Sequence, residues 1–176
     1  MSEEESRKYI DSVVRFMAED LDGKDVLEVG GGIGRLTARM VQRACAVTCI
    51  DASPQMLERN RERLGKLVNK VEFHEMFGQD YVPGRQHDVV VCSLVLIHNV
   101  VDEEFVRLTE VMAQCADTIF LFEHVDVAVQ VSAHTRPRTE DELCRAFKDY
   151  EVAKRHDYKL FTDRIVFLKL VRKGKH

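Results

Sequence analysis

The run from Asp25 to Thr37 constrains the fold more than any other segment, because an apolar stretch leads into a glycine-rich turn and then into a helical pattern. The apolar residues that begin at Val26 predict a buried strand. Glycines at positions 30, 32 and 34 permit positive φ and let a ligand approach the backbone closely. Glu28 precedes the first glycine, where it would attract an ammonium group and repel a pyrophosphate. The turn therefore predicts a site for a cationic nucleoside.

A dinucleotide is the main alternative ligand for such a turn. Its fingerprint is G-x-G-x-x-G, and the third glycine would fall at position 35, where the chain has Arg35. The spacing disfavours NAD. A nucleotide-dependent oxidoreductase is accordingly the least favoured function.

Residues 28–34, followed by Cys-Ile-Asp-Ala-Ser-Pro-Gln-Met-Leu at 49–57, resemble the first two nucleotide-binding motifs of class I S-adenosylmethionine-dependent methyltransferases. The resemblance covers nearly the whole chain. It implies that Glu28 and the glycine loop hold the methionine half of the cofactor and that Asp51 binds the ribose hydroxyls. A carboxylate suits a vicinal diol because it offers two acceptor oxygens to two donors. The alternative is that both acids are solvated strand ends beside a tight turn.

Further cofactor contacts are expected from the turns after the next strands. Met56, Met76 and Phe77 can offer backbone donors and an apolar face to an adenine ring, although a core or loop role is an equal alternative for them. Arg35 can reach the cofactor carboxylate as a bidentate fork, or it is a cation on a helix surface. The expected cofactor-binding residues are Glu28, Gly30, Gly32, Arg35, Asp51, Ala52, Met56, Met76, Phe77 and Ser93.

Strands alternating with helices predict an α/β fold with a parallel sheet that is covered on both faces. The expected strands span 25–30, 46–51, 70–75, 88–93, 118–123, 150–157 and 164–172, and the expected helices span 2–20, 33–44, 53–67, 103–115 and 139–147. The final two strands have no helix between them, so they predict a hairpin with an antiparallel last strand. The resemblance implies a doubly wound, seven-stranded sheet. Ligands bind such sheets at the carboxyl ends of the strands near the switch point.

Length and composition favour one soluble domain. The 176 residues are 45% hydrophobic, which suits a single core over 1–176, with an N-terminal helix in 1–22 and the sheet in 25–172. A net charge of −4 from interspersed acids and bases gives no reason to expect a nucleic acid or a membrane as partner. The basic end, from Arg172 to His176, is expected to be solvated.

The cysteines and the N-terminus bear on compartment and on metals. Five cysteines show neither a C-x-x-C pair nor zinc-type spacing, so buried, reduced thiols and no metal site are expected. The first residues are acidic and lack an apolar core, which argues against a secretory signal. A cytoplasmic protein is expected.

Methyl transfer from a sulfonium is an in-line displacement, so the protein mainly positions and desolvates the reactants. A general base is needed only if the nucleophile arrives protonated. The candidates are His98, after the fourth strand, and His124, at the end of the fifth, with His134 as a weaker third. His98 resembles the histidine at this place in many small-molecule and protein N-terminal α-amine methyltransferases. A structural role is the alternative for each.

The sequence does not identify the methyl acceptor directly. The residues after the fourth strand lack the Asn/Asp-Pro-Pro-aromatic motif of enzymes that methylate amide or exocyclic amino groups. Segments 30–37, 79–81 and 163–167 resemble protein N-terminal α-amine methyltransferases, which implies a small-molecule or peptide amine as acceptor. A non-catalytic module that binds or activates a partner protein is the alternative, motivated by the short N-terminus and the apolar stretch 94–97. The sequence predicts neither the oligomeric state nor the segment that covers the active site.

Overall fold

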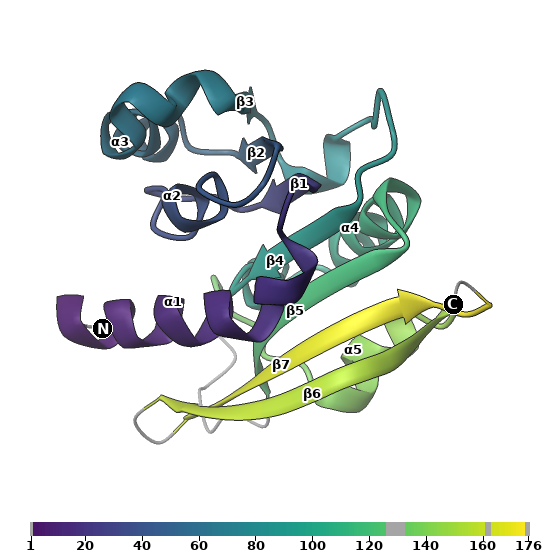
Figure 1. The fold of residues 1–176 in the computed structure, drawn as a ribbon. Helices are drawn as coiled ribbons and strands as arrows, with labels where there is room; N and C mark the ends of the chain where they lie inside the picture. Colours follow the sequence, from purple (N-terminus) through teal and green to yellow (C-terminus); the bar gives the residue numbers. More distant parts are fainter. Residues whose placement is uncertain (1, 126–132, 161–162, 175–176) are drawn as a thin grey trace.

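A computed structural model of the chain describes residues 2–125, 133–160 and 163–174, and its centre is one seven-stranded sheet in the order β3-β2-β1-β4-β5-β7-β6 (Figure 1). The strands are β1 Asp25–Val29, β2 Ala46–Asp51, β3 Val71–Glu75, β4 Val89–Ser93, β5 Thr118–Val125, β6 Tyr150–Leu160 and β7 Asp163–Arg172. The first five strands pair in parallel, whereas β7 is antiparallel to both of its neighbours. The predicted sheet with its antiparallel last strand is confirmed.

Helices connect most of the strands, and three of them begin with a side-chain cap. They are α1 Glu3–Met17, α2 Thr37–Met40, α3 Pro54–Leu64, α4 Asp102–Cys115 and α5 Glu140–Ala146, with 3₁₀ turns η1 Ala18–Asp20, η2 Gly65–Lys70, η3 Gly78–Asp80 and η4 Leu96–His98. Ser2 with Glu5, and Thr139 with Glu142, form reciprocal capping boxes. Ser53 caps α3 ahead of a proline in its first turn.

The helix predicted over 33–44 is reduced to the single turn of α2. Gly32 and Gly34 have φ of 52° and 75°, in the left-handed region, so the chain cannot be helical before residue 35. The glycine loop therefore takes residues that periodicity assigned to a helix.

Asp102 directly precedes the helix predicted over 103–115, where an aspartate is a favoured cap, but the cap position belongs to Val101. The Asp102 carboxylate instead binds Arg136 at 2.7 Å and Arg138 at 3.2 Å. Two cations from a segment more than thirty residues away along the chain thus outcompete the local backbone for this carboxylate.

Each face of the sheet has its own apolar core, and the helices divide between the faces (Figure 1). On one face α4 and α5 pack on the sheet through residues such as Phe105, Leu108 and Leu143. On the other face α1 and α2 contribute Val13, Phe16 and Met40, among others. Burial on both faces explains why the central strands read as nearly continuous apolar runs.

Aromatic rings fix α1 across the sheet. The Phe16 ring lies edge-on to the rings of Phe120, Phe122 and Phe167, with centroids 5.6–6.0 Å apart. Edge-to-face contacts at this distance suit the quadrupole of aromatic rings. The helix is thereby held with its N-terminal half near the carboxyl ends of the parallel strands.

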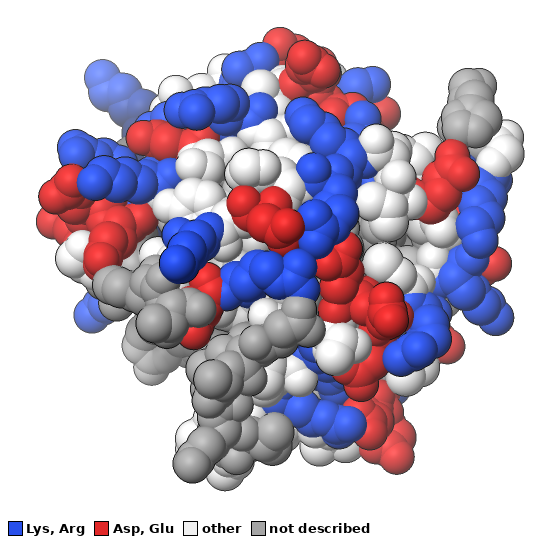
Figure 2. Space-filling view, turned by 90° about the horizontal axis from the view of Figure 1, so that it is seen from below, with Lys and Arg blue, Asp and Glu red and all other residues white. Residues whose placement is uncertain are grey.

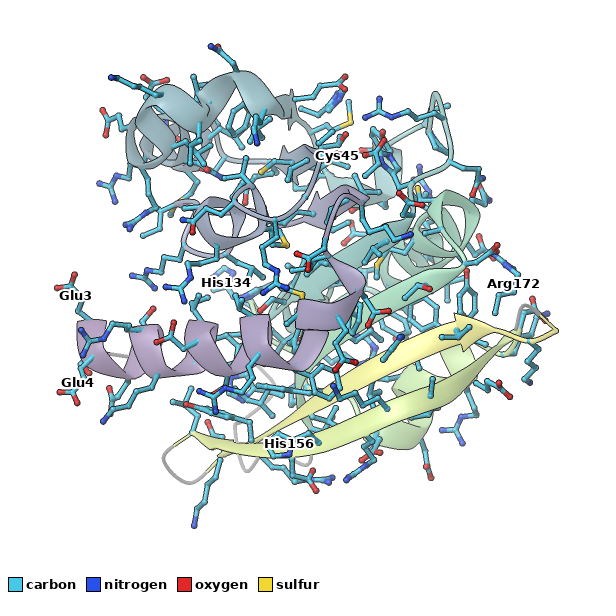
Figure 3. The ribbon with its side chains drawn as sticks, in the orientation of Figure 1. Glu3, Glu4, Cys45, His134, His156 and Arg172 are labelled. Atoms are coloured by element: carbon cyan, nitrogen blue, oxygen red, sulfur yellow. The ribbon has the colours of Figure 1, made fainter. Side chains whose placement is uncertain are left out.

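Two sequence expectations about exposure need correction (Figure 3). Cys45 is exposed, whereas Cys49, Cys92 and Cys115 are buried as predicted. Arg172 does not belong to a solvated tail, because it ends β7 and its guanidinium donates to Asp117 Oδ1 at 2.6 Å.

Charges of both signs are interspersed over the face shown in Figure 2, in agreement with the mixed charge pattern of the sequence. In the part of the chain that the structure describes, no helix is long and apolar enough to cross a bilayer.

Replacement of Phe122 by alanine tests the aromatic support of α1. Phe122 is fully buried, so Phe122→Ala should lower the unfolding free energy by about 3–5 kcal/mol in urea denaturation. Phe77→Ala is the matched control, because that ring is 61% exposed and its loss should change stability by only about 0.5 kcal/mol. Similar losses in both variants would contradict the packing described for α1.

Candidate functional site

A cavity of about 160 Å³ lies at the switch point of the sheet, where β1 and β4 end side by side. The glycine loop and the carboxyl end of β4 form one side of it, and α1 forms the other. We call it the donor cavity, after the methyl donor that the sequence resemblance implies. The predicted residues that line it are Glu28, Gly30, Gly32, Arg35 and Ser93. The structure thus brings together residues from two segments that are about sixty positions apart in the sequence.

Three residues of α1 that sequence reasoning did not single out complete the donor cavity. Ser6, Tyr9 and Ile10 line it opposite the glycine loop. The Tyr9 hydroxyl and Ser93 Oγ lie 2.8 Å apart, within hydrogen-bond distance. Tyr9 is buried, and burial raises the pKa of its phenol. This bond joins α1 to β4 directly at the cavity.

The carboxyl of Glu28 is buried at the end of β1 and is held by a short chain of hydrogen bonds. Thr37 Oγ1 donates to Glu28 Oε2 at 2.5 Å, and Asn60 Nδ2 donates to Thr37 Oγ1 at 3.0 Å. Burial raises the pKa of Glu28 to about 7. A cation in the donor cavity would favour the ionised carboxylate, because an opposite charge stabilises it. Sequence reasoning missed Thr37 and Asn60, since only the fold brings α3 beneath the loop.

The glycine loop packs closely on its neighbours at several positions, although Gly32 has open space around it. A Cβ at Gly30 would overlap Val95, and a Cβ at Gly34 would overlap the side chain of Asn60. The Asn60 Oδ1 atom is buried without a hydrogen-bond partner in the described structure. Close approach, together with positive φ, explains the alternate glycines in physical terms.

Asp51 ends β2 beside the donor cavity and shapes the loop. Its Oδ2 accepts from Gly32 N at 2.8 Å, and its Oδ1 accepts from Ser53 N at 2.9 Å. Each carboxylate oxygen has a second acceptor position, so both oxygens can still accept from a diol.

The residues expected around adenine lie outside the lining of the donor cavity. Ala52 is exposed, and the side chains of Met56 and Phe77 are 40% and 61% exposed. These positions leave apolar surface open next to Asp51. Met76 differs, because its side chain packs against the core and its amide already donates to the Asp51 carbonyl at 3.1 Å. The Met76 amide is therefore already used between β2 and β3, and a contact of Met76 with adenine stays a prediction.

Arg35 stands at the mouth of the donor cavity. A second cavity of about 770 Å³ begins there, between α1 and the segment around α2, and Arg35 lines both. Its side chain is exposed and makes no ion pair with any residue in the described ranges. Glu3 and Glu4, which Figure 3 labels near the start of α1, line the second cavity as well. Arg35 is an exposed cation where the two cavities meet, so an anionic group in the donor cavity would lie close to it.

The candidate histidines lie near one another after β4 and β5. His98 is exposed at the end of η4, and its Nδ1 lies 3.1 Å from the carbonyl oxygen of His134. His124 Nδ1 is buried and lies 3.9 Å from Asp163 Oδ2. Burial lowers the pKa of His124, although Asp163 opposes the shift. Burial therefore favours the neutral form of the His124 imidazole. Residues 126–132 lie outside the described structure.

Comparison of the sequence with protein families gives a match to a family described as a methyltransferase domain, over residues 26–119. The magnesium-protoporphyrin O-methyltransferase of Rhodobacter capsulatus is 35% identical over 83 residues. That alignment covers 47% of this chain and only 37% of the relative.

Solved structures share the fold across nearly the whole chain. The magnesium protoporphyrin IX methyltransferase from Synechocystis PCC 6803, with bound SAH, superposes with a TM-score of 0.81 at 20% identity, covering 96% of this chain and 84% of its own. The N-methyltransferase NodS from Bradyrhizobium japonicum WM9, in complex with S-adenosyl-L-homocysteine, gives a TM-score of 0.86 at 14% identity, with 97% and 88% coverage. At these identities the likeness establishes the fold.

The close packing of Gly34 can be separated from its backbone strain. Gly34→Ala should destabilise the protein by about 1–3 kcal/mol more than Gly23→Ala in urea denaturation, because overpacking against Asn60 adds to the strain. Gly23 is the matched control, since its φ of 70° is nearly that of Gly34 but its Cβ would meet nothing within 4 Å. Equal destabilisation of the two variants would show that strain alone requires glycine at position 34.

The buried Glu28 should leave a signature in the pH dependence of stability. Its pKa is about 7 in the folded protein against an ordinary value of 4.5, so the native state binds the proton more tightly. The resulting stabilisation is complete below pH 4.5 and is lost as the pH rises through 7.

We expect the unfolding free energy of the wild type, measured relative to Glu28→Gln, to fall by on the order of 3 kcal/mol across that range. Denaturant unfolding of both proteins at several pH values measures this difference in unfolding free energy. Because both proteins share every other titrating group, a flat difference would refute a raised pKa at Glu28.

Proposed function

Because the chain belongs to the methyltransferase domain family, we propose that it transfers the methyl group of S-adenosylmethionine to a small-molecule or peptide amine. The family match confirms the methyltransferase predicted from the sequence. The observation that supports this reaction best is the buried Glu28 carboxyl at the donor cavity, with the Asp51 carboxylate at the adjacent strand end.

Each part of this cofactor has a chemically suitable residue at the site. The Glu28 carboxylate suits the ammonium group of the methionine half, and Arg35 suits its carboxylate. Asp51 suits the ribose hydroxyls. The exposed apolar side chains of Met56 and Phe77 offer surface to the adenine. The cofactor supplies an electrophilic methyl group on a sulfonium, and the protein positions it.

The donor cavity also favours the reaction by orienting the cofactor between its walls. Its walls are α1, the glycine loop and the end of β4, and the side chains of Tyr9 and Glu28 within them are almost fully buried. Orienting two reactants in such a site can lower a barrier by about 7–11 kcal/mol in favourable cases. The residues of α1 therefore serve as the wall that closes the donor side.

An amine acceptor must reach the sulfonium as the free base. His124 is held neutral by burial and His98 is exposed close to it, so either can accept a proton from an ammonium group near the ends of β4 and β5. The names of the similar proteins describe methyl transfer both to nitrogen and to oxygen. NodS is an N-methyltransferase, and the relative from Rhodobacter capsulatus is an O-methyltransferase named for magnesium-protoporphyrin.

Ligand-dependent thermal unfolding tests the cofactor. S-adenosylhomocysteine at 100 times its dissociation constant should stabilise the protein by about 2.7 kcal/mol, whereas NAD and ATP at equal concentration should leave the melting temperature unchanged. A shift with NAD alone would favour an oxidoreductase. No shift with any of the three would favour a module that binds a partner protein. A shift with the homocysteine product leads to an activity screen of amine acceptors.

The ribose assignment is tested by Asp51→Ala, measured by calorimetry with S-adenosylhomocysteine. The variant should lose about 1–3 kcal/mol of binding free energy, because hydrogen bonds to a charged group disappear. Asp22→Ala is the control, since Asp22 pairs with Arg43 in an exposed salt bridge. Unchanged affinity in Asp51→Ala would remove Asp51 from the cofactor site.

A further inference from the structure

The loop after β4 bounds the donor cavity in an unusual conformation. Ser93 and Leu94 line the cavity. Val95 packs so tightly on Gly30 that a Cβ at position 30 would overlap the Val95 side chain. Leu94 has φ of 58°, and among the described residues it is the one non-glycine with positive φ. Backbone strain of this kind persists only where the surroundings enforce it, and it is concentrated at functional sites.

A buried carboxyl on the neighbouring strand enforces this conformation. The Leu94 amide still donates to the Phe122 carbonyl at 2.8 Å, as if the ladder between β4 and β5 continued. The chain then turns away, and the amides of Val95 and Leu96 both donate to Glu123 Oε1 at 2.8 Å. Glu123 is 1% exposed. Its side chain therefore satisfies two amides that the turn removes from the sheet.

A buried cation holds the opposite end of the same loop. Arg138 donates to the carbonyl of Leu96 at 3.3 Å and to that of Asn99 at 3.0 Å. Its guanidinium lies 3.7 Å from the centre of the Phe105 ring. The loop thus has a carboxyl group at its amides and a guanidinium at its carbonyls, an arrangement that matches the direction of the peptide dipoles when Glu123 is ionised.

We propose that Glu123 is a positioning residue for the methyl donor: through the amides of Val95 and Leu96 it holds the Leu94–His98 loop against Gly30 and so fixes one wall of the donor cavity. This role rests on the proposed function, because it concerns the same cavity. Glu123 itself does not line the cavity, so it acts through the loop.

The electrostatic surroundings agree with such a role. Burial raises the pKa of Glu123 to about 7, while the loop amides and Arg138 favour the ionised form. Tyr9 on α1 and Cys92 on β4 are the other titratable groups coupled to Glu123. The second carboxyl oxygen, Oε2, is buried without a hydrogen-bond partner in the described structure. A side chain that only filled space here would avoid the cost of burying this oxygen.

The test compares Glu123→Ala with Glu123→Gln in calorimetry with S-adenosylhomocysteine. Alanine removes both acceptor bonds, so the dissociation constant should rise about tenfold or more. Glutamine keeps an oxygen that can accept from both amides, so its dissociation constant should stay within about threefold of the wild type. This rescue distinguishes positioning of the loop from a requirement for charge.

Ile119→Ala is the matched control for general destabilisation. Ile119 is fully buried on the same strand, near its opposite end, where it pairs with Val90 and Leu170. The control should lower the melting temperature while leaving the dissociation constant unchanged in measurements well below that temperature. If Glu123→Ala binds as the wild type does, or if Ile119→Ala weakens binding equally, the positioning role is refuted.

Hydrogen exchange tests the contact between Glu123 and the loop without any ligand. In the ligand-free protein the amides of Val95 and Leu96 should be protected, and Glu123→Ala should speed their exchange at least about tenfold while Ile119→Ala leaves it unchanged. If the wild type does not bind S-adenosylhomocysteine, the proposed function fails, but hydrogen exchange still shows whether Glu123 holds the amides of the loop. If binding is normal and exchange at these amides is the same in Glu123→Ala, only the positioning role fails.

Discussion

The hydrogen bond between Thr37 and the buried Glu28 carboxyl is the interaction on which the rest of the site depends. It joins the end of β1 to the start of α2, and Asn60 extends it to α3. Between these anchors a Cβ would overlap neighbouring side chains at Gly30, Gly31 and Gly34. An ionisable group buried in this way is costly unless it is hydrogen-bonded, so the network and the loop conformation support each other.

A second buried carboxyl plays a corresponding part on the other side of β4. Glu28 organises the loop after β1, and Glu123 on β5 organises the loop after β4. The two loops meet where Val95 packs on Gly30, and α1 covers them through the bond between Tyr9 and Ser93. The donor cavity is therefore bounded by elements that are each fixed by a hydrogen bond from a buried side chain.

Sequence periodicity predicted the elements correctly and some of their boundaries wrongly. The central strands are buried on both faces, and their apolar runs are visible without a structure. The length of α2 was not visible, because positive φ at Gly32 and Gly34 overrides helical periodicity. Asp102 has the properties of a cap, yet it binds arginines that approach only in the fold. Local patterns fail where a distant partner competes for the same group.

The sequence alone determined the fold class, the glycine loop and the two acids at the ends of β1 and β2. These features are local, because each depends on the order of residues within one strand and the turn after it. The tertiary structure decided what surrounds them. Thr37, Asn60, Tyr9 and Glu123 are polar residues in ordinary helical or strand patterns, with no local sign of function. Only packing brings them together, because a buried polar group takes whichever partner the fold places beside it.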